Sequence, residues 1–509
     1  MECDWRSEAV WGKMRKLEPL DSIFLDMERP TTPPVIGGLF MLDPSTSPGS
    51  FVRHRDILKY VGDRLHIVPN LRRKLIFSAL GIDAPRLVDD PDFDLEFHVR
   101  HIGLPRPRDR RQLKILVARL MSRPMDLNRP LWEMYIIEGL EEIPEFASDA
   151  FAVLMKVHHA AFDGAAAGAA LWAMTQDTPD ESPSPPVEPW QPAPIPGAIA
   201  RTTSFVSEGI SQLVSNLRSI PSLGGSAITA AVSAMEDGGK IQMAPKTRFQ
   251  NKISSHRVFD WVVFTRAEAN EVRNGLGKPK MNDMVLCIIA GAIRRYLMEK
   301  SELPESTLSA ICPINIRGNR DPTEGGNFVT VMRAGIGTHI RDPLERLAYI
   351  ADQTVRGKAQ AEQLGGDFAG NLLALYPYAI RSRAVRGLSA LIASGNIQAQ
   401  PANLIITNIP NPAGGHYLAG AKVLEYAGFG PVVDGLGMFH TVTGMDWELS
   451  MSVTSCRTVM PDIEHYMDCL TESFGELRKL SNVSRTAAAL GKSRANARAA
   501  AKPAKTAKD

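Results

Sequence analysis

The stretch Phe151 to Trp172, FAVLMKVHHAAFDGAAAGAALW, contains the features that decide the fold. Its first seven residues form an apolar run that predicts a buried strand. His158 and His159 follow directly, Asp163 and Gly164 come a few residues later, and a run of small residues then predicts a helix. The pattern H-H-x-x-x-D-G therefore lies at a junction between a strand and a helix.

The two histidines have different surroundings, because neighbouring side chains of a strand point to opposite faces. A metal site made by both rings is therefore not expected. A neutral imidazole is the natural base near neutral pH, so the ring that faces a cavity is a candidate general base. Asp163 brings a charge to the turn, and Gly164 permits a tight turn or a close backbone approach. The alternative is a pair of buried, hydrogen-bonded histidines followed by an aspartate helix cap.

Length and composition indicate a large globular chain. Its 509 residues suggest at least two domain-sized units or one pseudo-duplicated fold. Hydrophobic residues make up 44% and charged residues 22%, which is ordinary for a protein with a packed core. The net charge of +2 argues against nucleic acid as the main partner.

The cysteine pattern, together with the lack of a signal-peptide or membrane-span pattern in the sequence, points to the cytoplasm. The five cysteines are widely spread and form no C-x-x-C pair, so neither a zinc site nor a disulfide framework is indicated: Cys3, Cys287, Cys312, Cys456 and Cys469. The N-terminus has no apolar core typical of a signal peptide, and no segment has the roughly 18 apolar residues of a membrane span. Contact with an inner membrane or a lipid droplet would be peripheral.

Hydrophobic patterning predicts strands and helices in alternation along both halves of the chain. The predicted extended segments are 35–42, 88–101, 132–140, 151–157, 257–264, 308–319 and 403–412. The predicted helices are 51–65, 111–121, 267–274, 281–300, a segment from 341 and a closing helix after 460. Asn282 is expected to cap the helix at 281–300.

Composition divides the chain into four parts. Residues 1–177 form an N-terminal half that contains the histidine motif, and residues 246–480 form a C-terminal half. Between them, residues 178–245 comprise a Pro-rich linker and a helix near 205–220 whose apolar stripe suits packing over the core or, alternatively, contact with lipid. Residues 481–509 are Ala-rich and basic, which predicts a disordered tail with at most weak attraction to anionic lipid.

The histidine motif resembles the signature of the CoA-dependent acyltransferase superfamily. Much of the remaining chain resembles the bacterial wax ester synthase/diacylglycerol acyltransferase family in particular. The matching segments include the following: LRRKL from Leu71, DDPDFDLEFHVRH from Asp89, a P-L-W motif at Pro130, Leu131 and Trp132, an N-D motif at Asn282 and Asp283, CPINIR ending at Arg317, a G-N motif at Asn327, and NLIITNIPNP around Thr407 and Asn408. Taken alone, P-L-W is equally typical of a turn followed by a core tryptophan.

The resemblance implies a mixed α/β chloramphenicol-acetyltransferase-like fold with two halves and an active-site tunnel between them. It implies transfer of a long-chain acyl group from acyl-CoA to diacylglycerol or a long-chain alcohol, with no bound cofactor or metal. His159 would be the general base, and His158 would support it. Thr407 and Asn408 are candidates for stabilising the oxyanion, although both would also suit a turn before Pro410. No G-x-S-x-G motif supports an acyl-serine intermediate.

Asp163 is predicted to be structural and not a proton carrier. A buried carboxylate at such a junction needs a cationic or hydrogen-bonding partner. Arg317, at the end of a predicted strand in the second half, is the expected partner, and the pair would hold the histidine loop in place.

One segment departs from the family pattern. Residues Met438 to Trp447, MFHTVTGMDW, keep a strand-like pattern but differ in their polar and aromatic residues, and they place His440 and Trp447 near an expected pocket wall. Because of this difference, the resemblance does not specify which alcohol accepts the acyl group. Two other functions stay open: a condensation-type acyltransferase with a carrier-bound donor, and a catalytically silent lipid-binding relative.

Overall fold

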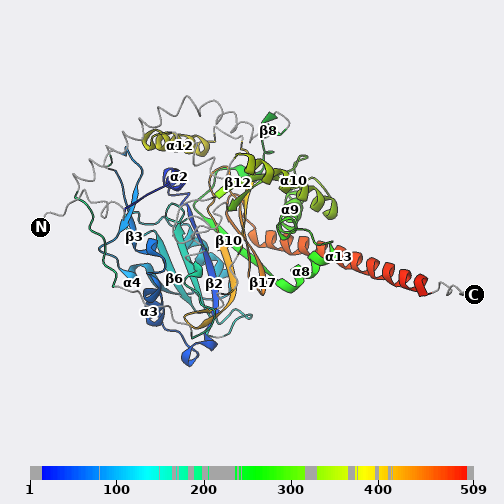
Figure 1. Ribbon diagram of the computed structural model, residues 1–509, viewed down its shortest axis with the longest axis horizontal. Coiled ribbons are helices and arrows are strands. Elements are labelled where there is room, and N and C mark those ends of the chain that lie inside the picture. Colours follow the sequence, from blue (N-terminus) through cyan, green and yellow to red (C-terminus); the bar gives the residue numbers. More distant parts are fainter. Residues whose placement is uncertain are drawn as a thin grey trace, which may run out of the picture.

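The computed structural model contains two six-stranded mixed sheets with helices packed around them (Figure 1). It describes residues 14–78, 81–147, 149–162, 168, 171–180, 189–197, 205, 236–237, 240–241, 243–315, 329–364, 373–374, 376–395, 400–410, 414 and 417–500. The predicted mixed α/β class with two halves is confirmed.

The first sheet has the order β14-β15-β2-β7-β6-β5. Its strands are β14 (Tyr417–Leu418), β15 (Ala421–Phe429), β2 (Val35–Asp43), β7 (Phe151–His158), β6 (Trp132–Glu138) and β5 (Val99–Gly103). All eight residues of β7 are buried, because layers of side chains cover both of its faces. This arrangement explains the uninterrupted apolar run in the sequence.

Helices cover the two faces of the first sheet differently. On one face, α2 (Pro19–Met27) and α3 (His54–Arg64) share a core with the strands. On the other face, α5 (Arg110–Met121) packs against the sheet through its apolar stripe and also meets Phe259 and Trp261 of the second half. The predicted helix at 111–121 is thus confirmed, and it lies between the two halves.

The region predicted to be extended at 88–101 is extended only in part. Strand β4 (Arg86–Asp89) pairs with β3 (Arg73–Ile76) and β1 (Arg15–Lys16) in a small separate sheet. A helical turn, α4 (Leu95–His98), then interrupts the segment before β5 begins. The Asp94 carboxylate accepts a hydrogen bond from the Glu96 amide at 3.0 Å, which is the side-chain cap that favours a helix start.

The second sheet has the order β10-β17-β16-β13-β11-β12. Its strands are β10 (Arg257–Thr265), β17 (Glu448–Cys456), β16 (Phe439–Gly444), β13 (Leu404–Pro410), β11 (Ser309–Asn315) and β12 (Val329–Gly335). A helical layer packs on it, comprising α8 (Arg266–Gly275), α9 (Met281–Glu299), α10 (Pro343–Leu364) and α13 (Ile463–Ala500) (Figure 1). The remaining elements are α12 (Tyr378–Ala393), the hairpin β8 (Glu236–Asp237) and β9 (Lys240–Ile241), and short 3-10 turns at Pro44–Thr46, Pro48–Ser50, Pro69–Arg72 and Arg248–Gln250.

The cap predicted for α9 is wrong. The helix begins at Met281 after Lys280, so Asn282 lies inside the first turn and makes no side-chain cap bond. Asp283, its neighbour, is buried and accepts a 2.9 Å hydrogen bond from the Thr354 hydroxyl of α10. This part of the motif therefore joins two helices.

The boundary between the halves is less simple than the sequence suggests. Strands β14 and β15 fall within residues 246–480, yet β15 pairs antiparallel with β2, from Lys422 opposite Asp43 to Phe429 opposite Gly37. Gly38 fits this contact, since a Cβ there would lie 2.3 Å from the Tyr426 ring. The second half thus completes the first sheet.

The tail differs from the prediction of disorder. Helix α13 continues to Ala500, and alanine is the residue with the highest helix propensity. The helix predicted at 205–220 lies outside the described residues except for Phe205. Among the described helices, none is long and apolar enough to cross a bilayer.

Candidate functional site

His158 ends β7 and is completely buried. Its Nδ1 accepts a hydrogen bond from the Ala160 amide at 3.0 Å, so the ring proton of the neutral form resides on Nε2. Nε2 in turn lies 3.4 Å from a carboxylate oxygen of Glu28, to which it donates. Both nitrogens of His158 are thereby engaged in holding the junction.

His159 has different surroundings. Its backbone amide donates to the Pro34 carbonyl at 2.9 Å, and its half-buried ring stacks on Phe24 of α2. The ring centroids are 3.8 Å apart and the ring planes are inclined by 12°. An aromatic face so close fixes the plane of the imidazole, which is the kind of orientation that a general base requires.

The segment Glu28 to Pro34 joins the histidines to the second half. Arg29 forms an ion pair with Asp434, and the Arg257 guanidinium donates to the Thr31 carbonyl. Asp434 also accepts a hydrogen bond from the Ile253 amide at 2.8 Å. Because Glu28 and Pro34 contact the two histidines directly, both halves position the motif.

Helix α2 is itself anchored to α12 by buried polar contacts. The Arg381 guanidinium donates to the Ser22 hydroxyl at 2.8 Å. Asp26 is buried and accepts hydrogen bonds from the Ser382 hydroxyl and from Arg386. These contacts fix the helix that presents Phe24, and none of them is predictable from local sequence, since α2 and α12 lie more than 350 residues apart.

The P-L-W motif contacts the end of the strand that contains His158. The His158 amide donates to the Leu131 carbonyl at 3.0 Å, and Trp132 pairs with Val157. The Trp132 indole is fully buried and donates to the Leu71 carbonyl at 2.7 Å. Trp132 is therefore a core residue, and Pro130 precedes it in the turn.

Lys156 was missed by the sequence analysis, although it lies two residues before His158 on the same face of β7. Its ammonium is fully buried and donates to the Arg123 carbonyl at 2.6 Å and to Glu133 at 3.3 Å. Burial lowers the pKa of Lys156, while Glu133 opposes that shift. The partner of Lys156 cannot be predicted from the apolar run around it, because Glu133 lies on a different strand, β6.

The other predicted site residues are only partly placed. Thr407 and Asn408 lie on β13 opposite Thr441 and Val442 of β16; Thr407 is half-buried and Asn408 is exposed. Four predicted residues lie outside the described ones, so the structure does not test the proposed ion pair of the histidine loop: Asp163, Gly164, Arg317 and Asn327.

The expectation that His440 lies at a pocket wall is wrong. The ring is fully buried in the core of the second half, where Nε2 lies 2.8 Å from the Tyr466 hydroxyl. Burial lowers the pKa of His440 to about 3, so it remains neutral at physiological pH. Trp447 is half-buried, and its indole donates to the Leu424 carbonyl at 3.1 Å.

Buried hydroxyl groups line one face of β16 and β17. Thr441 lies opposite Ser452, and Thr443 lies opposite Ser450. The hydroxyls of Thr441, Thr443 and Ser450 have no hydrogen-bond partner among the described residues. Buried polar groups usually have a partner, so these three hydroxyls are exceptions among the described residues.

The same face lies against the first sheet. A Cβ on Gly428 of β15 would be 2.6 Å from the Thr441 side chain, and the Ser452 hydroxyl donates to the Gly428 carbonyl. The hydroxyl groups therefore line the contact between the two sheets, where the resemblance places a tunnel.

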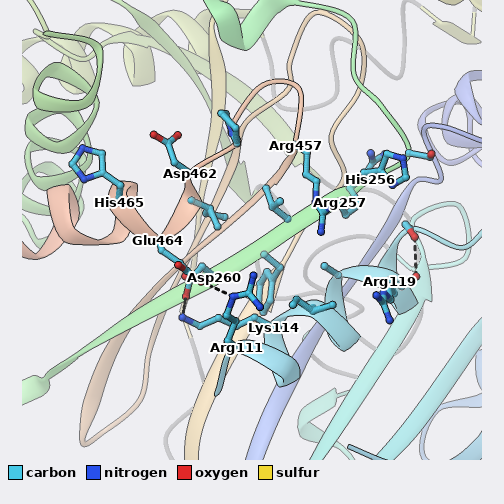
Figure 2. A pocket seen from close by; sticks show the side chains of 18 residues that line it. Arg111, Lys114, Arg119, His256, Arg257, Asp260, Arg457, Asp462, Glu464 and His465 are labelled. Carbon is cyan, nitrogen blue, oxygen red and sulfur yellow. Dashed lines mark hydrogen bonds and ion pairs between the residues drawn. The ribbon is translucent and has the colours of Figure 1, made fainter. Parts of the chain in front are cut away.

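A cavity of about 650 Å³ lies between α5, the start of β10 and the start of α13 (Figure 2). Asp260, which lines the cavity, pairs with Lys114 at 2.6 Å, while Arg111 pairs with Glu464 at 3.7 Å. Arg257, which contacts Thr31, also borders the cavity.

Comparison with known proteins gives the family. Residues 17–285 match the model of the wax ester synthase/diacylglycerol acyltransferase catalytic domain, and residues 325–478 match the C-terminal domain of the same family. The chain belongs to the wax ester synthase/diacylglycerol acyltransferase family. It is accordingly an acyltransferase, and the resemblance seen in the sequence is confirmed.

Individual relatives match over nearly the whole chain. The O-acyltransferase WSD of Acinetobacter baylyi is 30% identical over 472 residues, which are 90% of this chain and 96% of that protein. A Mycobacterium tuberculosis protein that carries a diacylglycerol O-acyltransferase name is 29% identical over 485 residues, or 93% of this chain and 92% of its own length. The solved structure of the wax ester synthase/diacylglycerol acyltransferase from Marinobacter aquaeolei VT8 has a TM-score of 0.63 and 24% identity, and covers 92% of this chain and 100% of that chain.

Proposed function

We propose that this protein transfers a long-chain acyl group from acyl-CoA to the hydroxyl of diacylglycerol or of a long-chain alcohol. The observation that carries the proposal is the unequal environment of the two histidines. His158 uses both ring nitrogens to hold the junction, whereas His159 presents a ring held in plane by Phe24. The names of the relatives, diacylglycerol acyltransferase and wax ester synthase, support the substrate classes.

In the proposed reaction His159 takes the proton of the acceptor hydroxyl as that oxygen attacks the thioester carbonyl. The tetrahedral intermediate then collapses, the C–S bond breaks, and the CoA thiolate receives the proton from the imidazolium. General base catalysis of this kind typically contributes about 10² to 10⁴ in rate. Thr407 and Asn408 remain candidate donors to the oxyanion.

The acyl donor is expected to be long-chain. Each buried methylene contributes about 0.8 kcal/mol, so an apolar tunnel would favour long chains steeply. We expect the glycerol or alcohol end of the acceptor to bind near the unpartnered hydroxyls of Thr441, Thr443 and Ser450, which are polar groups between the two sheets. With such substrates, the protein is expected to work at the surface of a membrane or lipid droplet.

The decisive experiment measures CoA release from palmitoyl-CoA with diacylglycerol or hexadecanol as acceptor. Wild-type protein is expected to release CoA only when an acceptor is present, and His159→Ala at matched folded concentration is expected to lose most of that turnover. Activity with a carrier-bound acyl donor but not with palmitoyl-CoA would favour a condensation-type enzyme. Binding of the lipids without turnover would favour a silent relative, and equal activity of wild type and His159→Ala would reject His159 as the base.

A further inference from the structure

Three side chains with different metal-binding atoms meet on the helical layer of the second half. His465 and Cys469 lie one turn apart on α13, and Glu299 ends the facing helix α9. The His465 Nε2 is 2.5 Å from a Glu299 carboxylate oxygen and 4.0 Å from the Cys469 sulfur. All three donor atoms lie within 4.8 Å of one another.

The three donor atoms suit a metal ion of intermediate softness, such as Zn²⁺. One imidazole nitrogen, one thiol sulfur and one carboxylate oxygen are the three ligand types that Zn²⁺ uses, with bonds of about 2.0 to 2.3 Å. Tetrahedral bonds of that length place the donor atoms roughly 3.3 to 3.7 Å apart. To reach that range, the distance between His465 Nε2 and the Glu299 oxygen would need to lengthen by roughly 0.8 Å, and the distance between Nε2 and the Cys469 sulfur would need to shorten by roughly 0.4 Å.

Neighbouring charges leave the Glu299 carboxylate available. Arg295, one turn earlier on α9, pairs with Glu472 at 3.0 Å and also with Glu476. Those two carboxylates of α13 are thereby neutralised by a guanidinium. Glu299, in contrast, has His465 as its ion-pair partner, which is itself a metal-ligand type.

An ion has a route to the cluster from two sides. His465 borders the 650 Å³ cavity, with Asp462 and Glu464 close by (Figure 2). Glu299 borders a second cavity of about 620 Å³ between α9 and the start of α10. Three protein ligands would leave one coordination position that water can fill from either side.

We propose that Glu299, His465 and Cys469 bind one Zn²⁺ ion that clamps α9 to α13. The ion would reinforce an end of the helix pair where Asp462 already accepts hydrogen bonds from Tyr296 and Lys300, each at 2.6 Å. The clamp is independent of the acyl transfer proposed at His159. The sequence alone does not reveal it, because His465-x-x-x-Cys469 supplies only two ligands and Glu299 is 166 residues away.

The test uses the full chain, freed of metal and of any affinity tag, with Cys3→Ser to remove the cysteine outside the described residues. One equivalent of Co²⁺ is expected to give a near-ultraviolet charge-transfer band from a cobalt-bound thiolate, which Zn²⁺ abolishes by competition. Zn²⁺ is expected to raise Tm until one equivalent is bound. Absence of the band in this protein would overturn the proposal.

Variants assign the band to the cluster. Cys469→Ser should abolish it, and His465→Ala or the more conservative Glu299→Gln should weaken Zn²⁺ binding by more than the roughly 10- to 100-fold that loss of an outer-shell partner typically costs. His101→Ala is the matched control, because His101 and Glu138 form a similarly exposed pair at 2.9 Å that belongs to no three-ligand group among the described residues. A band that survives Cys469→Ser, or that responds to His101→Ala equally, would contradict the assignment, and Glu299→Gln keeps it testable should Cys469→Ser not fold.

Discussion

The imidazole of His159 lies face to face with the phenyl ring of Phe24, with centroids 3.8 Å apart. This contact links the histidine loop to a helix more than a hundred residues earlier in the chain. Aromatic pairs of this kind contribute about 0.5 to 1.5 kcal/mol beyond burial, so the stack can determine the direction in which the imidazole points.

Phe24→Leu is expected to lower kcat by roughly 2- to 10-fold, because the apolar volume is kept while the stacking face is lost. The measurement is palmitoyl-CoA turnover as a function of pH, since a misoriented base changes the pH profile as well as the rate. Phe93→Leu is a matched control, because Phe93 stacks on His98 with an interplanar angle of 13° outside the histidine motif. Equal loss in both variants would mean that the effect is general destabilisation.

His158→Ala is expected to reduce stability by about 1 to 3 kcal/mol, because the buried Ala160 amide and Glu28 lose their partner. His158→Asn should recover part of the loss, since the asparagine oxygen can accept the Ala160 amide as Nδ1 does. Urea unfolding of the wild type, His158→Asn and His158→Ala is expected to show stability that decreases in that order. Stability that is the same in both variants would show that the Nδ1 contact does not matter.

The raised pKa of Glu448 predicts that the protein becomes less stable as pH rises. Burial raises its pKa to about 8, against an ordinary value of 4.5. Between these values the native state keeps a proton that the unfolded chain releases, so the free energy of unfolding falls by up to ~1.4 kcal/mol per pH unit. Urea unfolding at pH 5, 6.5 and 8 should show a shallower decline in Glu448→Gln, whose side-chain oxygen can still accept the Tyr426 amide. Exposed Glu142→Gln is the control, and an unchanged slope in Glu448→Gln would refute the assignment.

Lys156→Ala is expected to cost about 1 to 3 kcal/mol, because the Arg123 carbonyl and the Glu133 carboxylate both lose the buried ammonium, while Glu133 keeps Tyr135 and Arg100 as partners. Glu133→Gln should cost less in that background than in the wild type, since the Lys156 ammonium that it would deprive of a partner is then absent. A double-mutant cycle from chemical unfolding measures the coupling. Additive costs would show that the two groups do not depend on each other.

The predicted pair Asp163 and Arg317 is tested by the same type of cycle. Asp163→Asn is expected to lower both Tm and activity, and Arg317→Gln should reproduce much of that loss. Strong coupling is expected if the two charges are in contact. Coupling near zero would reject the pairing and leave the role of His159 untouched.

The strands and helices with strong hydrophobic periodicity could be predicted from the sequence. The strand ending at His158 and the helix at Arg110–Met121 are examples, since local pattern alone specifies them. The α9 cap was predicted wrongly because Asn282 is a good capping residue, yet the helix begins one residue before it. Local preference is a weak guide to the exact end of a helix.

The partners of the site residues could not be predicted, because they come from distant segments. Glu28 meets His158 across 130 positions, and Lys156 meets Glu133 across 23. For His440 the sequence predicts a position near a pocket wall, whereas the structure encloses the ring in the core. No periodicity in the sequence distinguishes these outcomes, because each depends on how the sheets pack.

The pairing of β15 with β2 has a consequence for biosynthesis. β2 and β7 are complete once residue 158 has been made, but the strand that covers the free edge of β2 ends at Phe429. At about 5 to 20 residues per second, synthesis of the intervening 271 residues takes roughly 15 to 50 s. During that interval the nascent chain exposes an unpaired edge capable of joining other chains, so the ribosome-bound intermediate is a natural client for chaperones. A gene split in the region between the halves would likewise yield a first fragment that cannot finish its own sheet without the second.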